Sequence, residues 1–229
     1  MNQGALHAAE TPVGGCYDVI IIGAGPGGIY AAYELVRAQP GMRVAVFESG
    51  NRLDKRKCPI DGVKVKSCIS CTHCSIMTGF GGAGAFSDGK YNITNDFGGT
   101  LYEYIGKQQA IELMEYVDGI NLAHGGAGTK RYASASPELK TLCMQHKLKL
   151  LDATVRHLGT DVNRVVLARL YAELAQQVDF HFLSPVDCIE ACDGGFAIHA
   201  KGRAYRCKQC IVSVGRSGSK WMERVCTSL

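Results

Sequence analysis

The segment from Tyr17 to Gly50 constrains the fold of this chain more than any other part of the sequence. It reads YDVIIIGAGPGGIYAAYELVRAQPGMRVAVFESG. An apolar run, a glycine-rich turn, a helix of apolar and small residues and a second apolar run predict a βαβ unit. The run Val19–Ile22 shows no polar alternation, which is typical of a parallel strand covered on both faces. We therefore expect a doubly wound, Rossmann-like α/β domain.

The turn of this unit, GAGPGG from Gly23 to Gly28, fits the dinucleotide-binding pattern G-x-G-x-x-G. It follows a strand, opens a helix, and precedes an acidic residue at the end of the next strand, Glu48, and this context makes the pattern specific. The first glycine permits the tight turn, the second lets the backbone approach a pyrophosphate, and the third allows the helix to pack closely on the strand. We expect the nucleotide to contact Gly23, Gly25, Pro26, Gly27, Gly28 and Glu48.

The acidic residue also indicates which nucleotide the turn prefers. A carboxylate at position 48 accepts hydrogen bonds from both ribose hydroxyls of an adenosine, and its charge repels a 2′-phosphate. NADP is therefore disfavoured at this turn.

Further along the chain, the pattern of apolar residues predicts three helices and a group of short strands. Helical spacing predicts a helix over 107–125, a shorter one from Ser136, and a third that follows Thr160–Asp161 and ends near Gln177. Turn signals at 193–195 and 201–202 predict a small antiparallel β-meander. We expect a flexible N-terminus over 1–16 and one domain over 17–229, containing a cysteine- and glycine-rich segment over 49–101 and the β insertion over 178–209.

Composition and charge exclude several classes of partner. The net charge is +4, and no basic run is interleaved with aromatic residues, so we expect no nucleic-acid partner. The N-terminus has no pattern of a signal peptide and no apolar run is long enough to cross a membrane. The eleven cysteines are an odd number in a chain large enough to have its own core, which argues against a secreted disulfide framework. We expect a cytoplasmic protein with no membrane partner and with reduced or metal-bound thiols.

Four of these cysteines are spaced as metal ligands are. Cys68, Cys71 and Cys74 form C-x2-C-x2-C, and Cys58 lies ten residues upstream. Four thiolates can hold a [4Fe-4S] cluster, with Cys58 as the fourth ligand, or a zinc ion, for which His73 can replace one thiolate. A reduced cysteine cluster without metal is the third interpretation. The sequence leaves these three open.

The remaining cysteine pair and the histidines carry weaker signals. Cys207 and Cys210 form C-x2-C within a predicted strand, and we expect them to be ordinary strand residues. Four histidines have no cysteine or carboxylate at ligand spacing, and we expect them to be structural or exposed. They are His124, His146, His181 and His199.

A glycine-rich loop from Gly79 to Lys90 follows the cysteines. Its glycines allow positive φ angles and a close approach of the backbone to a flat ring or a phosphate. The alternative interpretation is a surface loop with a solvated lysine.

These motifs together resemble those of the two-dinucleotide-binding-domain flavoproteins, and most closely a family of FAD-dependent dehydrogenases. The resemblance rests on DVIIIGAGPGGIYAAYEL with VAVFESG, on GFGGAGAFSDGKYNITND, on RHLGTDVNRVV and on IVSVGRSG. It implies that the βαβ unit holds the ADP half of FAD, with Arg52 nearby, that the strand around Val186 offers its backbone to the adenine, and that Gly215 belongs to a late turn near the cofactor.

The resemblance also implies that the glycine loop borders the flavin ring. Gly82 then approaches the ring, Ser87 and Asp88 hydrogen-bond the ring or a substrate, and Lys90 places a cation that stabilises reduced flavin. We expect these last three to be the catalytic residues. The expected function is an FAD-dependent oxidoreductase that transfers electrons or hydride, with a small-molecule substrate and an electron donor that the sequence does not specify.

The end of the chain suggests two alternative functions. The glycine/aspartate strand that follows later in this family has no counterpart after Gly218, so the chain reads as a C-terminally shortened member. The alternatives are a non-catalytic nucleotide-binding remnant, or an iron–sulfur or zinc module with a vestigial cofactor site.

Overall fold

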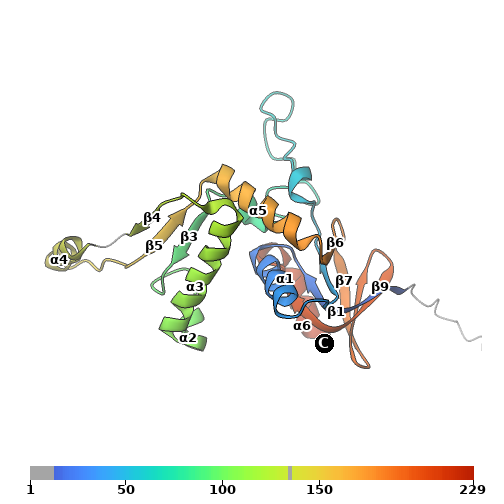
Figure 1. The fold of residues 1–229 in the computed structure, drawn as a ribbon. Coiled ribbons are helices and arrows are strands. Elements are labelled where there is room, and N and C mark those ends of the chain that lie inside the picture. Colours follow the sequence, from blue (N-terminus) through green and yellow to red (C-terminus); the bar gives the residue numbers. More distant parts are fainter. Residues whose placement is uncertain (1–12, 134–135) are drawn as a thin grey trace, which may run out of the picture. The chain divides into compact units, whose positions relative to one another are not determined.

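The computed structural model describes residues 13–133 and 136–229 (Figure 1). Its strands are β1 (Val13–Ile22), β2 (Val44–Phe47), β3 (Lys90–Ile93), β4 (Arg131–Ala133), β5 (Thr154–His157), β6 (Val178–His181), β7 (Val186–Cys192), β8 (Gly195–Ala200) and β9 (Arg203–Val212). Its α-helices are α1 (Pro26–Ala38), α2 (Leu101–Ile105), α3 (Lys107–Asn121), α4 (Pro137–Gln145), α5 (Thr160–Leu174) and α6 (Ser219–Ser228). Short helical turns are η1 (Leu53–Lys55), η2 (Gly82–Phe86), η3 (Leu122–Gly126) and η4 (Arg216–Gly218).

These elements divide into two compact units. The six-stranded unit comprises the described residues up to Ala83 together with Glu173–Leu229. The three-stranded unit comprises Gly84–Ala172. Within the described residues, the first unit contains a sheet of order β6-β2-β1-β9-β8-β7, and the second a sheet of order β3-β5-β4.

The six-stranded sheet is parallel at one end and antiparallel at the other. Strands β6, β2, β1 and β9 run parallel, whereas β9, β8 and β7 form an antiparallel meander. The doubly wound α/β fold is therefore confirmed. The predicted β insertion over 178–209 needs a correction, because its first strand, β6, pairs in parallel with β2. Residues 182–185 separate β6 from β7, and they include Pro185, which cannot donate a ladder hydrogen bond.

Strand β1 begins earlier than the sequence predicts. Residues 1–12 of the predicted flexible N-terminus lie outside the described residues, but β1 already starts at Val13. The ten-residue β9 provides the partner, because Val13 pairs with Ala204 and Tyr17 with Cys207. No Cβ would fit at Gly14, which lies against the ring of Tyr205.

The core of this unit lies on both faces of β1, as its apolar run predicts. Side chains alternate across a strand, and Ile20 and Ile22 belong to a buried cluster that includes Val225 of α6. On the opposite face, Ile21 is fully buried and approaches Gly28 of α1. Helices α1 and α6 therefore cover opposite faces of the parallel sheet.

The three-stranded unit contains the three helices that the spacing predicts. Helix α3 begins at Lys107, α5 begins at Thr160, and α4 begins at Pro137 after the N-cap Ser136. The Leu139 N–H donates to Ser136 Oγ at 3.1 Å, which satisfies one unpaired donor of the first turn.

The antiparallel sheet of this unit is not predicted by the sequence. Strands β3 and β5 pair through Lys90 and His157, and β4 pairs with the other edge of β5. Each of the two longer strands buries a single side chain, Ile93 in β3 and Arg156 in β5. With one buried residue per strand, and a charged one in β5, no apolar alternation is present for a sequence reading to detect.

A buried ion pair links β5 to α3 in this unit. The Arg156 guanidinium donates from Nε and Nη2 to the two carboxylate oxygens of Asp118, and its Nη1 donates to the Thr129 carbonyl at 2.7 Å. Both charged side chains are about 5% exposed. Removal of one partner from such a pair leaves a buried charge without compensation.

We predict that Asp118→Asn lowers the free energy of unfolding by about 3–5 kcal/mol, because it leaves the Arg156 charge buried and unpaired. Urea unfolding followed by circular dichroism measures the change. Glu115→Gln is the matched control. Glu115 lies on α3, the same helix as Asp118, but forms an exposed ion pair with Arg131 of β4. Exposed pairs contribute about 0–1 kcal/mol. An Asp118→Asn loss no larger than that of Glu115→Gln would contradict the prediction.

Candidate functional site

The glycine turn after β1 has the geometry of a dinucleotide-binding turn. Gly23 has φ +105° and its N–H donates to the Phe47 carbonyl at 2.8 Å. A Cβ at this position would lie 2.4 Å from the Ser213 carbonyl oxygen, at the end of β9. Both the backbone conformation and the space therefore require glycine at position 23.

Gly28 brings α1 into close contact with β1. A Cβ there would lie 1.9 Å from the Gly23 carbonyl oxygen and 3.3 Å from Ile21 Cγ2. Only a hydrogen atom fits. Position 27 is also restricted, because a Cβ on Gly27 would lie 2.5 Å from Ser213 Oγ. The third glycine of the motif is thus required by helix–strand packing, as predicted.

Gly25 is different, because nothing in its surroundings requires a glycine. It is the N-cap of α1 with an extended backbone, φ −74° and ψ −178°, and a Cβ would meet no atom within 4 Å. No side chain caps this helix, and Pro26 occupies its first turn. The N–H groups of a first helical turn have no partner within the helix. Open space at this helix N-terminus leaves room for an anion.

Glu48, at the end of β2, is buried and connects three loops. Its Oε1 accepts from the N–H groups of Gly50 at 2.8 Å and Gly79 at 2.9 Å and from Ser49 Oγ at 3.2 Å. Its Oε2 accepts from the Ala24 N–H at 2.8 Å. A carboxylate offers about four acceptor positions. Within the described residues, Oε2 accepts only this one hydrogen bond, so one of its acceptor positions stays available.

The start of the glycine-rich loop packs directly on the glycine turn. The Gly81 N–H donates to the Ala24 carbonyl at 2.8 Å, and a Cβ built on Gly82 would lie 3.2 Å from the Gly25 Cα. Gly82 has φ +57°. The structure therefore places Gly82 beside Gly25 and Pro26 of the glycine turn.

Arg56 holds this loop in place and was not found by sequence reasoning. It is 4% exposed and donates to three carbonyls, those of Ser75, Ile76 and Phe80, at 2.7–2.9 Å. Burial lowers the pKa of its guanidinium to about 10, and the negative charge of Glu48 opposes that shift. The side chain stays charged at neutral pH. A single arginine in an irregular segment gives no periodic signal, so nothing in the sequence distinguishes it from a solvated residue.

The four cysteines with ligand spacing lie on the irregular loop between η1 and the glycines. Cys68 and Cys71 are exposed, and Cys58 and Cys74 are partly buried. Within the described part of the chain, only one group brings three ligand atoms of histidine, cysteine, aspartate or glutamate within 4.8 Å of one another, and it contains none of these four cysteines. The structure therefore does not gather three of these four thiols into one site.

The other three predicted cofactor residues lie in the same unit. Arg52 is exposed, and its guanidinium donates to both carboxylate oxygens of Asp54 at 2.6 and 2.7 Å. Val186 begins β7 with its side chain in the buried cluster. Gly215 has φ +62° and follows Ser213, whose N–H donates to the Ile22 carbonyl at 2.8 Å.

The three predicted catalytic residues lie in the three-stranded unit and are exposed. Lys90 Nζ is 2.7 Å from Asp88 Oδ2, and His157 Nε2 is 4.0 Å from the same oxygen. The hydrogen bond from Lys90 is the main cause that lowers the pKa of Asp88. Ser87 Oγ donates to the Gly84 carbonyl at 2.8 Å, so its hydroxyl serves the turn itself.

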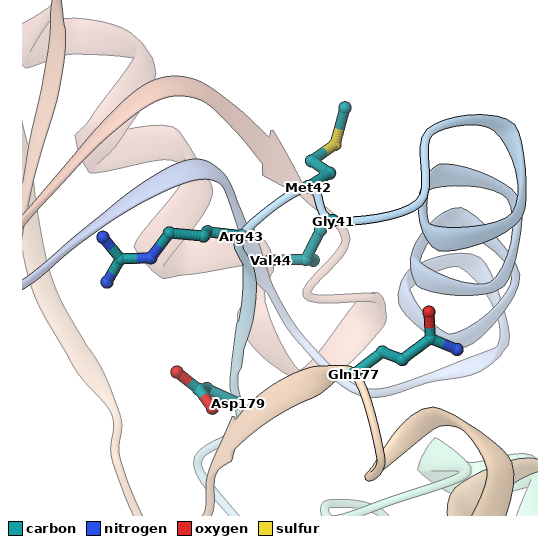
Figure 2. A pocket seen from close by; sticks show the side chains of 6 residues that line it. All are labelled: Gly41, Met42, Arg43, Val44, Gln177 and Asp179. Atoms are coloured by element: carbon teal, nitrogen blue, oxygen red, sulfur yellow. The ribbon is translucent and has the colours of Figure 1, made fainter.

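A polar pocket of about 290 Å³ lies elsewhere in the six-stranded unit (Figure 2). It is lined by Gly41, Met42, Arg43, Val44, Gln177 and Asp179. These residues precede or begin β2 and β6, so the pocket is at the amino ends of two parallel strands. Ligands of open α/β sheets bind at the carboxyl ends, where the glycine turn lies. The pocket is therefore separate from the dinucleotide turn.

Ser213 is a further contributor that the sequence analysis missed. Its carbonyl and hydroxyl limit the space at Gly23 and Gly27. The signal that would have found it is topological: the carboxyl ends of parallel strands meet at one edge, and β9 ends at Val212 beside β1.

Comparison with known proteins agrees with this geometry. Residues 17–114 match the family model described as pyridine nucleotide-disulphide oxidoreductase. Glycine oxidase from Geobacillus kaustophilus has a similar structure, with 17% sequence identity and a TM-score of 0.52, over 93% of this chain and 58% of that one. The amino acid oxidase NikD of nikkomycin biosynthesis is similar at 13% identity and a TM-score of 0.53, over 91% of this chain and 54% of that one.

These matches cover only part of the matched structures, and their sequence identities are low. The chain spans 54–58% of the length of these two structures, and at such identities the likeness establishes the fold. No curated protein matches the sequence. In the described residues, none of the helices is both long and apolar enough to cross a membrane.

We predict that Glu48→Gln lowers the free energy of unfolding by about 1–3 kcal/mol. The glutamine NH2 group takes the place of one carboxylate oxygen and cannot accept a hydrogen bond, so at least one of the backbone N–H groups now bound to Glu48 stays buried without an acceptor. Urea unfolding measures the loss. Glu223→Gln on the exposed side of α6 is the control in the same unit, and surface substitutions of this kind usually change stability by less than about 0.5 kcal/mol. Equal stability of the two variants would refute the role of Glu48.

Proposed function

We propose that this chain, which has the fold of the two-dinucleotide-binding flavoproteins, is the FAD-binding part of a flavin-dependent oxidoreductase. The glycine turn and Glu48 hold the ADP half of FAD. Bound FAD supplies transfer of electrons or hydride at its flavin ring. The chain's own residues bind the nucleotide and orient it.

The observation that carries the proposal is the open space at Gly25. The neighbouring glycines 23 and 28 are required by backbone conformation or packing, whereas a Cβ at position 25 would meet no atom within 4 Å. Packing does not fill the space beside this glycine, which leaves room for a group outside the chain. Unpaired N–H groups and the positive end of the helix dipole face that room, and both favour a pyrophosphate.

Glu48 supports an adenosine as the adjoining group. Its Oε2 keeps an acceptor position beside the glycine turn, so a ribose hydroxyl can donate there without displacing the backbone contacts of Oε1. The negative charge disfavours a 2′-phosphate at the same place. FAD and NAD fit this site, and the resemblance of the sequence favours FAD.

The roles of the remaining predicted residues are proposed from the resemblance of the sequence to FAD-dependent dehydrogenases. Arg52, Val186 and Gly215 are proposed to lie along the nucleotide. Ser87, Asp88 and Lys90 are proposed as the residues that meet the flavin ring or the substrate. The substrate is a small molecule whose class these residues do not specify.

We predict that Gly25→Val loses FAD while the chain stays folded. The valine side chain fills the space of the pyrophosphate, and its Cβ meets no protein atom within 4 Å. Because position 25 is the N-cap of α1 and valine is a poorer N-cap than glycine, we expect a loss of only about 1 kcal/mol in the free energy of unfolding. Titration of the purified chain with FAD, followed by absorbance and flavin fluorescence, measures binding, and urea unfolding measures stability.

Two further variants make this test specific. Gly28→Ala places a methyl group against the Gly23 carbonyl and is expected to lose about 1–3 kcal/mol of stability. Gly119→Ala, at an open position in α3 of the other unit, is expected to keep both stability and FAD. If Gly25→Val binds FAD as tightly as the unmodified chain, the proposed turn does not hold the nucleotide.

We also propose that the loop thiols Cys58, Cys68, Cys71 and Cys74 bind an iron–sulfur cluster or zinc. They lie on one loop without helix or strand between η1 and Gly79, and a metal would gather them as it folds such a segment. Anaerobic purification followed by iron, sulfide and zinc analysis is expected to find metal that Cys68→Ser with Cys71→Ser removes. Equal metal content in both proteins would exclude this ligand set.

A further inference from the structure

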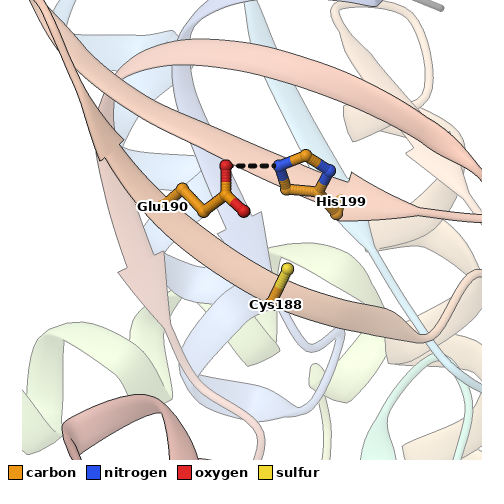
Figure 3. Close-up of side chains that lie close together, drawn as sticks. All are labelled: Cys188, Glu190 and His199. Atoms are coloured by element: carbon orange, nitrogen blue, oxygen red, sulfur yellow. Dashed lines mark ion pairs between the residues drawn. The ribbon is translucent and has the colours of Figure 1, made fainter. Parts of the chain in front are cut away.

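The solvent face of the β7–β8 hairpin carries a cysteine, a carboxylate and a histidine that lie together (Figure 3). Cys188 and Glu190 are two residues apart on β7, so both point to the same side of the sheet. His199 on β8 is the direct cross-strand partner of Cys188. The Sγ, carboxylate oxygen and imidazole nitrogen lie within 4.8 Å of one another. The expectation that His199 lacks ligand partners therefore fails, because strand pairing supplies them.

A β-bulge is responsible for this arrangement. Val186 pairs with Ala200 and Cys188 with His199, so β7 contains one extra residue, Asp187, between the two pairs. In a regular strand residues 186 and 188 would share a face. Here Val186 is 8% exposed in the core, whereas Cys188 is exposed to solvent. Bulges commonly re-aim a side chain in this way near functional sites.

The Nε2 nitrogen of His199 gives a second, independent indication of a ligand. His199 Nε2 is a buried atom without a hydrogen-bond partner in the described part of the chain, although it lies 3.1 Å from Glu190 Oε2. A buried polar atom that lacks a partner in a native structure commonly contacts a water or an ion. Two ligands of a tetrahedral zinc ion, at 2.0–2.2 Å from the metal, are about 3.4 Å apart. The nitrogen and oxygen are thus already near the spacing of coordinating atoms.

We propose that Cys188, Glu190 and His199 form a zinc site on this hairpin, separate from the nucleotide turn and from the loop thiols. Thiolate, imidazole and carboxylate are the three ligand types that zinc accepts, whereas magnesium and calcium avoid sulfur and nitrogen. Three protein ligands leave the fourth position to water. Because β7 is an edge strand of the sheet, the ion would tie that edge to β8.

Coordination exchanges a proton for the metal. A cysteine thiol has an ordinary pKa of about 8.5, so without metal it is mostly protonated at neutral pH. Binding of the ion releases this proton to solvent and forms the metal–thiolate bond.

Cobalt(II) is the probe that tests the site, because a cobalt–thiolate bond gives a charge-transfer absorption and tetrahedral cobalt a characteristic visible spectrum. The reduced, metal-free chain is titrated with Co²⁺, and Zn²⁺ is then added to displace it. We expect both Cys188→Ser and His199→Gln to weaken cobalt binding at this site by more than about 100-fold, since changes to residues that only support a ligand already cost 10–100-fold.

The control variants separate this site from other thiols. Cys192→Ser changes an exposed cysteine of the same strand, and Cys68→Ser with Cys71→Ser disables the loop set. Both are expected to keep the site at full affinity. Circular dichroism establishes that each variant is folded. The proposal is overturned if Cys188→Ser retains the full charge-transfer absorption, if His199→Gln binds unchanged, or if the absorption is lost only with the loop thiols.

Discussion

The buried carboxylate of Glu48 is the interaction on which the rest of the nucleotide-binding region depends. It accepts hydrogen bonds from the glycine turn, from the residues that leave β2 and from the start of the glycine-rich loop. These three segments are far apart in the sequence and have no common strand or helix. A single charged acceptor satisfies their backbone donors at once, and charge-assisted hydrogen bonds are stronger than neutral ones. The arrangement of the loops therefore follows from one side chain.

Arg56 completes this arrangement with the opposite charge. It donates to the Phe80 carbonyl of the glycine-rich loop and to the carbonyls of Ser75 and Ile76 just before that loop, whereas Glu48 accepts from the Gly79 N–H at the loop's start. One buried anion satisfies donors and one buried cation satisfies acceptors, so a segment with almost no apolar core of its own keeps a defined path. The loop is thus held by polar contacts, and Gly82 is carried to the side of Gly25.

The sequence predicts well what depends on local periodicity and poorly what depends on pairing at a distance. The apolar run of β1, the glycine turn and the Ser136 cap each follow from a few adjacent residues, and the structure has them. The three-stranded sheet does not follow, because Arg156 is buried through its ion pair with Asp118 and looks solvated in the sequence. The group around His199 was missed for the same reason, since a bulge and a strand register bring its members together. Sequence spacing alone contains neither.

Strand β9 is the parallel neighbour of β1 and the antiparallel neighbour of β8, and this double role has a consequence for folding. Ile22 pairs with Val212, 190 positions later in the chain, whereas β8 and β9 are joined by a two-residue turn. The local hairpin can form within microseconds, but the central pairing carries the entropy of closing a very long loop. During synthesis at roughly 5–20 residues per second, β1 stays without its partner for roughly 10–40 s. One long edge of the first strand is thus exposed to chaperones, or to other nascent chains, until β9 has been made.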